Sequence, residues 1–183
     1  MDRSALSDEE QLTCALARSQ PSDTTLARAR TLLEKSLDWQ RVVQQALDHD
    51  VVAFVYLNLK RHLVSDVPEE PLSTLRSIYH TQFRRSLQIR GELQGLLDHL
   101  ADSDVDAVPF KGPALAAQAY RDENMRTFTD LDLLVHPEEA ERAIAALQTL
   151  GFEEKHGRYS EYPTHWTSYA PWHAPHENAN GLV

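Results

Sequence analysis

Apolar residues recur at helical spacing through the first hundred positions of the chain. Ser7 and Glu10 form the sequence pattern of a capping box, in which each side chain satisfies a backbone donor of the other residue. This pattern predicts a first helix directly after Ser7, with Leu12 and Leu16 on its apolar side. Further helices are predicted over residues 22–37, 39–49 (with Asp38 as the N-cap), 51–63 and 72–100. The β-branched residues of 51–63 leave a strand as the alternative there.

The pattern of apolar residues changes near residue 103. Strands are predicted over 105–110 and 131–135, and helices over 112–119 and from Pro137 to a C-cap at Gly151. From Phe152 onward the residues suit strands and turns. The expected fold class is α+β, with an N-terminal helical region (1–103) followed by a core (104–183) in the order β-α-β-α-β. That order indicates a small mixed sheet with flanking helices.

Composition and charge narrow the class of protein. The chain has 183 residues and a formal net charge of -10, which argues against bulk nucleic-acid binding because that mode needs a positive surface. Cys14 is the only cysteine, so an intramolecular disulfide and a cysteine-built zinc site are excluded. The N-terminus is polar and acidic, unlike a secretory signal, and the apolar run 51–57 is too short to span a bilayer. We therefore expect a cytoplasmic protein with no membrane part.

Asp130 and Asp132 are the candidate metal ligands. Residues two apart on a strand point to the same face, so the predicted strand would place both carboxylates about 6–7 Å apart on one face. Two carboxylates so arranged repel each other unless a cation lies between them, and Mg²⁺ favours hard oxygen ligands. Asp-x-Asp alone is also typical of a solvated strand end or a helix cap, so that alternative stays open.

Lys111 and Gly112 are the candidate phosphate ligands. They stand where a predicted strand turns into a predicted helix, and the first backbone donors of a helix are free to bind phosphate. A plain tight turn is the alternative for this pair. Arg126 could bind a triphosphate or form an ion pair with the acidic residues, and the sequence does not separate these roles.

A set of residues between 110 and 152 resembles a known family. The resemblance rests on Phe110-Lys111-Gly112-x-x-Leu115, Tyr120, Arg126, the run Asp130-Leu131-Asp132-Leu133-Leu134-Val135, and Leu150-Gly151-Phe152. These residues are similar to the uncharacterised bacterial nucleotidyltransferase family of the DNA polymerase β-like superfamily. The helical segment before them is similar too, and the resemblance covers nearly the whole chain.

The resemblance implies a magnesium-dependent enzyme that transfers a nucleoside monophosphate from an NTP to an acceptor. Asp130 and Asp132 would hold two Mg²⁺ ions, while Lys111 and Gly112 would hold phosphates, although the superfamily's usual Gly-Ser pair is absent here. The superfamily also uses a third carboxylate on a later strand. It is expected just after the segment 180–183, and the chain ends at Val183, so we expect the core to be incomplete at its C-terminus.

Other functions and partners stay open at this point. One alternative is a non-catalytic nucleotide-binding or interaction module, and another is a glycosyltransferase of the Asp-x-Asp kind. The acceptor could be a small molecule, a protein or an RNA. The histidines at 156, 165, 173 and 176 match no standard spacing of zinc ligands, so solvated hairpin residues are expected there.

Overall fold

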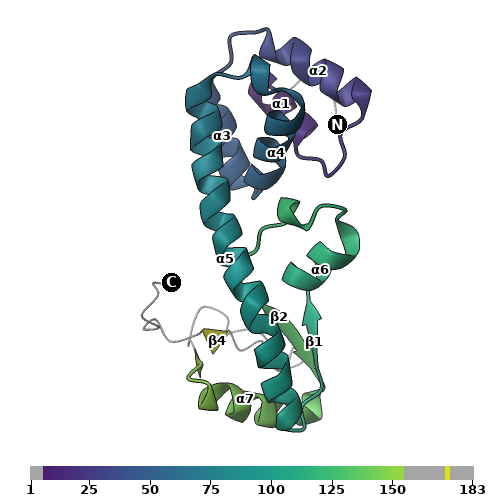
Figure 1. The fold of residues 1–183 in the computed structure, drawn as a ribbon, viewed down its shortest axis with the longest axis vertical. Coiled ribbons are helices and arrows are strands. Elements are labelled where there is room, and N and C mark those ends of the chain that lie inside the picture. Colours follow the sequence, from purple (N-terminus) through teal and green to yellow (C-terminus); the bar gives the residue numbers. More distant parts are fainter. Residues whose placement is uncertain (1–5, 155–171, 174–183) are drawn as a thin grey trace. The chain divides into compact units, whose positions relative to one another are not determined.

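The computed structural model describes residues 6–154 and 172–173 (Figure 1). The N-terminal region is helical, as predicted. Its helices are α1 (Asp8–Leu16), α2 (Asp23–Leu33), α3 (Trp39–Asp48), α4 (Val52–His62) and the long α5 (Glu69–Asp102), with a 3-10 turn η2 (Val64–Asp66) before α5. No helix in the described part of the chain is both long enough and apolar enough to cross a membrane.

Local side-chain caps explain where the first helices begin. Ser7 and Glu10 form the predicted capping box, with Ser7 N–H donating to Glu10 Oε2 at 2.7 Å and Glu10 N–H donating to Ser7 Oγ at 3.3 Å. Asp38 caps α3 as predicted, since its carboxylate accepts from Arg41 N–H at 3.1 Å. α2 ends at Leu33, four residues earlier than the sequence pattern predicted, and residues 34–37 connect it to the α3 cap at Asp38.

The segment with the open strand alternative is a helix. Seven of the eleven residues of α4 are buried, all within Val52–Leu59. Packing on all sides therefore outweighs the weak strand preference of β-branched residues. Buried Asn58 donates from Nδ2 to the carbonyls of Leu16 and Arg18, each at 2.8 Å, and so satisfies the end of α1.

The described chain folds into two compact units, and each unit is built from segments that are separate in the sequence. The first unit contains residues 6–86 and 112–129, and the second contains 87–111, 130–154 and 172–173. The boundary lies within the residues of α5, between Ser86 and Leu87. The sequence change near residue 103 coincides with the end of this helix at Asp102. The division into a helical region and a catalytic core stays a prediction.

The first unit is a helical bundle completed by a later segment. In it α1 packs against α2, α3 and α4. The helix α6 (Gly112–Ala119) and the 3-10 turn η3 (Glu123–Met125) come from the later segment. Met125 is 2% exposed within the bundle core, and Tyr120 packs on Phe54 with ring centroids 5.9 Å apart. The bundle core is therefore closed by residues that follow α5 in the chain.

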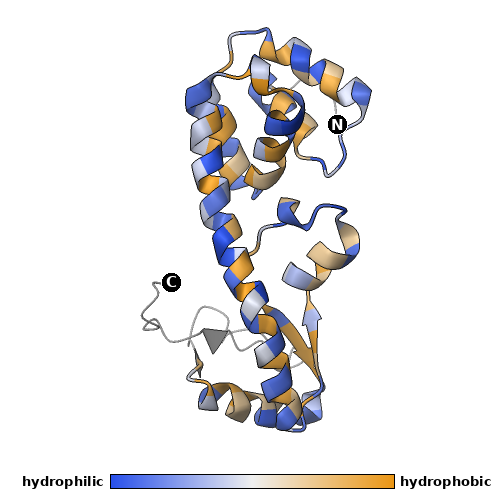
Figure 2. Ribbon diagram, in the orientation of Figure 1, coloured by the Kyte–Doolittle hydropathy of each residue, from blue (hydrophilic) through white to orange (hydrophobic). Residues whose placement is uncertain are grey.

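The second unit contains the sheet. Strands β1 (Ala107–Phe110) and β2 (Asp132–Val135) pair antiparallel, and α7 (Ala140–Thr149) follows a 3-10 turn η4 (Pro137–Glu139). β2 is hydrophobic along most of its length (Figure 2). One face of the pair packs on a small core through Ala107, Leu133 and Val135. The buried members of this core are Leu100, Val105, Ala143 and Ala146.

Residues with a positive φ follow the C-terminal ends of α3, α5 and α7. Gly151 (φ 86°) follows α7, and the N–H groups of Gly151 and Phe152 bond back to Gln148 and Leu147, which is a Schellman motif. The prediction of a C-terminal glycine signal is therefore confirmed. Asp50 and Asp104 take the same role after α3 and α5, with φ of 55° and 54°. Val105 belongs to the α5 motif through its bond to Leu100, so β1 begins at residue 107 instead of 105.

The α+β class is confirmed. The described strands pair antiparallel, β1 with β2 and β3 (Glu153–Glu154) with β4 (Trp172–His173). The β3–β4 pair lies where the sequence indicated strands and turns. The predictions for the histidines at 156, 165 and 176 fall outside the described residues.

Candidate active site

Asp132 is the first residue of β2 and lies beside the end of β1. Its strand partner is Phe110, the last residue of β1, so the two side chains belong to the same face of the sheet. The Asp132 side chain is 24% exposed, which leaves the carboxylate accessible to a ligand. The antiparallel pairing therefore carries the predicted carboxylate next to the strand-to-helix turn at Lys111.

Lys111 contacts this carboxylate. Its Nζ is 3.6 Å from Asp132 Oδ2 and 5.5 Å from the centroid of the Phe110 ring. The lysine side chain is 57% exposed, so the ion pair alone contributes little to stability. The geometry instead places one cation and one carboxylate at a shared, solvent-accessible position within the second unit.

The backbone of Lys111 is in the left-handed region, with φ at 56°. A residue with a β-carbon is less stable there by about 1–2 kcal/mol, and glycine is the usual occupant. The two other non-glycine residues with positive φ in the described chain are aspartates at helix ends, a residue type that tolerates this region. Lys111 is not at such an end. This unusual backbone conformation makes the Lys111 side chain a candidate for a functional role.

Asp130 lies ahead of the strand. β2 begins at Asp132, two residues later than Asp130, and Asp130 is an exposed residue in a bend. The predicted strand began at residue 131, so the argument from alternation along one strand does not extend to Asp130. Its role as a metal ligand stays a prediction.

Gly112 and Arg126 belong to the first unit. Gly112 is buried and begins α6 directly after Lys111, as the sequence predicted for a strand-turn-helix. Arg126 is half-buried, and its Nε atom is buried without a hydrogen-bond partner among the described residues. A buried donor without an acceptor is costly, and an anionic ligand would satisfy it. The predicted phosphate-binding roles of both residues stay predictions.

A buried serine holds the segment between Arg126 and Asp130. Ser86, in α5, is 3% exposed, and its Oγ accepts from Phe128 N–H at 2.8 Å and donates to Phe128 carbonyl at 3.0 Å. One hydroxyl therefore satisfies both backbone groups of a buried residue outside regular structure. This contact is not predictable from the sequence, because a serine within a helical pattern gives no indication of a partner 42 positions away.

An ion pair anchors the segment before Arg126. Asp122 pairs with Arg61 of α4, and its carboxylate also accepts from Asn124 N–H at 3.0 Å. Burial raises the pKa of Asp122, but the hydrogen bonds and the positive charge of Arg61 outweigh burial and hold its pKa below the ordinary value. The charged form of Asp122 therefore stabilises the fold.

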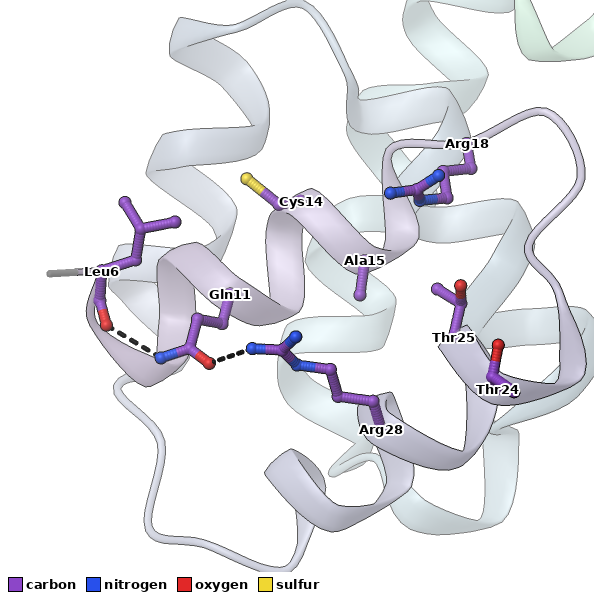
Figure 3. Close-up of a pocket in the computed structure, with 8 residues that line it drawn as sticks. All are labelled: Leu6, Gln11, Cys14, Ala15, Arg18, Thr24, Thr25 and Arg28. Atoms are coloured by element: carbon purple, nitrogen blue, oxygen red, sulfur yellow. Dashed lines mark hydrogen bonds between the residues drawn. The ribbon is translucent and has the colours of Figure 1, made fainter. Parts of the chain in front are cut away.

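A separate cavity lies in the first unit. It measures about 640 Å³ and lies along α1 and α2, where Gln11 bridges the Leu6 carbonyl and Arg28 (Figure 3). Its lining includes Cys14 and Arg18 and none of the predicted site residues. Across the described residues, no group of three or more His, Cys, Asp or Glu side chains is placed to hold a metal ion.

The fold and the candidate site together define a class of protein. It is an α+β protein in which a strand, a Lys-Gly turn and a helix precede a second strand that begins with an accessible aspartate. Comparison with protein families gives the particular assignment: residues 35–181 match the profile described as "Uncharacterised nucleotidyltransferase". The chain belongs to this family, which supports nucleotidyl transfer as its general activity. Comparison with curated proteins gave no match, and neither did comparison with solved structures.

Proposed function

We propose that the chain is a metal-dependent nucleotidyltransferase that takes a nucleoside monophosphate from an NTP. The observation that carries the proposal is the Lys111–Asp132 pair, which joins a cation and a carboxylate 3.6 Å apart at an accessible turn. A lysine held there in a costly backbone conformation supports a functional side chain. Family membership over residues 35–181 supports the reaction type.

Asp130 and Asp132 would hold Mg²⁺, two ions in all. The donor set fits, because both side chains are carboxylates in accessible positions and Mg²⁺ prefers oxygen ligands shared with phosphates. When bound, the metal would neutralise charge on the transferring phosphate and on the leaving pyrophosphate. We assign no geometry to the metal beyond these two ligands.

Lys111 would bind the triphosphate of the donor. An ammonium group more than half exposed can leave the Asp132 carboxylate for a phosphate oxygen when a metal takes its place there. Gly112 would bring the first backbone donors of α6 to the phosphates. For Arg126, in the first unit, a phosphate-binding role is supported separately, because its buried Nε has no hydrogen-bond partner among the described residues.

The acceptor is an alcohol, amine or other nucleophile on a small molecule, a protein or an RNA. The chemistry needs one bond formed between the acceptor and the α-phosphate and one bond broken to pyrophosphate. A non-catalytic nucleotide-binding module is the second candidate, and it predicts nucleotide binding without pyrophosphate release. The family assignment favours nucleotidyl transfer over the glycosyltransferase alternative.

The test is calorimetric titration of each NTP, in Mg²⁺ and in EDTA, into wild type and into Asp130→Asn and Asp132→Asn. We expect magnesium-dependent binding that both substitutions weaken at least tenfold. Asp98→Asn is the matched control, because it removes the same charge from an exposed-face carboxylate of α5 whose hydrogen bond within the described residues comes from Gln94. Binding that survives EDTA, or that the control weakens equally, would contradict the proposal. Pyrophosphate release with pools of each acceptor class then separates the enzyme from the binding module.

A further inference from the structure

The face of the β1–β2 pair opposite its core is apolar and exposed. Val108 and Leu134 are direct cross-strand partners, and they are 56% and 54% exposed. Phe110, two residues along β1 on the same face, is 46% exposed. An antiparallel sheet with one packed face usually carries polar side chains on the other. These three residues, which we call the apolar platform, are therefore suited to contact with an apolar ligand group.

The apolar platform adjoins the candidate site. Phe110 is the strand partner of Asp132, and the Lys111 ammonium lies 5.5 Å from the Phe110 ring centroid and 3.6 Å from the Asp132 carboxylate. The same face thus has a charged end at Asp132 and Lys111 and an apolar end at Val108 and Leu134. A ligand that fits both ends has an anionic group joined to a flat apolar group.

We propose that the apolar platform binds the base of the donor nucleotide, an inference that rests on the proposed function. An NTP is a ligand of the required kind, since its triphosphate is anionic and its base is a flat ring. Residues two apart on a strand are spaced by about 6–7 Å, so Phe110 and Val108 together offer a surface the size of a purine. Phe110 is then a specificity-determining residue for the donor.

Binding of the base on the apolar platform predicts how the site selects among the four bases. Val108, Phe110 and Leu134 present no hydrogen-bonding side-chain atoms, so the apolar platform itself does not read the edge of a base. Stacking on an aromatic side chain accepts every base and increases with ring area. The donor site therefore accepts all four NTPs and favours ATP and GTP over CTP and UTP by several-fold.

The experiment compares nucleotides with a ligand that has the phosphates and no base. ATP, GTP, CTP, UTP and inorganic tripolyphosphate are titrated into the full chain in Mg²⁺. We expect both purine nucleotides to bind about tenfold more tightly than tripolyphosphate, with pyrimidine nucleotides between them. In Phe110→Ala, ATP affinity should fall to the tripolyphosphate value while tripolyphosphate affinity is unchanged. Phe110→Trp should keep the tighter binding of ATP.

The exposed Val64 provides a matched control for Val108. Val108→Ala should weaken ATP binding, whereas Val64→Ala, at a valine 51% exposed in η2, should not. Equal affinity of wild type for ATP and tripolyphosphate would overturn the inference alone and leave the proposed function standing. So would a strong preference for one base, or a dimer that Phe110→Ala dissociates, since a second copy would then cover the platform. Failure of both ATP and tripolyphosphate to bind in Mg²⁺ would overturn the proposed function and this inference with it.

Discussion

Replacement of Lys111 by glycine and by alanine tests the turn in two separate ways. Both substitutions remove the ammonium group and the ion pair with Asp132, which for exposed partners contributes about 0.2–1 kcal/mol. Only glycine also relieves the left-handed backbone, by about 1–2 kcal/mol, against an added chain entropy of about 0.5–1 kcal/mol. We therefore expect Lys111→Gly to be more stable than Lys111→Ala by about 0.5–1 kcal/mol.

The assay combines thermal unfolding with nucleotide titration. For a chain of this length the stability difference corresponds to a Tm that is roughly 1–4 °C higher for Lys111→Gly than for Lys111→Ala. Both variants should bind Mg²⁺-ATP about tenfold more weakly than wild type, because each lacks one charged contact to phosphate. Stability and binding should therefore separate in the glycine variant.

A second lysine gives the control for these variants. Lys35 is 48% exposed and pairs with Asp8 at 2.7 Å, so Lys35→Ala removes a similar ion pair and should leave ATP binding unchanged. An alanine variant as stable as the glycine variant would refute the left-handed backbone at residue 111. Full ATP affinity in either Lys111 variant would refute the phosphate role.

Three further predictions concern Ser86, Asp122 and Gly91. Ser86→Ala should lower the free energy of unfolding by about 1–3 kcal/mol, because it removes the hydrogen bonds that the Ser86 hydroxyl makes to the buried backbone of Phe128, and chemical denaturation measures this loss. Asp122→Asn should cost about 1 kcal/mol at pH 7 through loss of the Arg61 pair. The pKa of Asp122 is lowered in the folded state, so its contribution is full above the unfolded pKa of about 3.9 and is lost as pH falls through the folded value. Gly91→Ala should raise Tm, since a β-carbon there meets no atom within 4 Å and alanine stabilises a helix interior by about 0.5–1 kcal/mol.

For each of these three predictions, one experimental result would contradict it. Thr81→Ala, which removes a hydroxyl that donates to the Ser77 carbonyl within α5, is the control for Ser86→Ala, and an equal loss in both would contradict the contact to Phe128. A stability gap between wild type and Asp122→Asn that stays constant as the pH is lowered from 7 far into the acid range would contradict the lowered pKa. A Gly91→Ala variant less stable than wild type would mean that the alanine β-carbon meets an obstacle on α5.

The sequence predicted the order and type of most elements because their signals are local. The capping residues Ser7 and Asp38, and the terminal Gly151, act within a few positions of themselves. The element boundaries that differ from the prediction depend on hydrogen bonds to other parts of the chain. Val105 was assigned to a strand, but its N–H bonds back to Leu100 to close α5, which makes it part of a helix end.

The site was accessible to sequence reasoning only in part. Lys111 and Asp132 were found because their chemistry is visible in the residue types, and the register of β1 on β2 then brought them together. The left-handed conformation of Lys111 has no sequence signal, since a lysine there replaces the expected glycine. The Phe128 contact of Ser86 joins residues distant in the chain, and such contacts arise only from the folded arrangement.

The discontinuous first unit has a consequence during protein synthesis. α4 leaves the ribosome well before the segment that completes its core, and 61 positions separate Arg61 from its partner Asp122. At roughly 5–20 residues per second, the nascent bundle waits about 3–12 seconds for that segment. During this interval the surface that later receives Tyr120 and Met125 is open to other chains and to chaperones. Slow translation of the stretch encoding α5 would lengthen the exposure, and the yield of folded protein should depend on the codons used there.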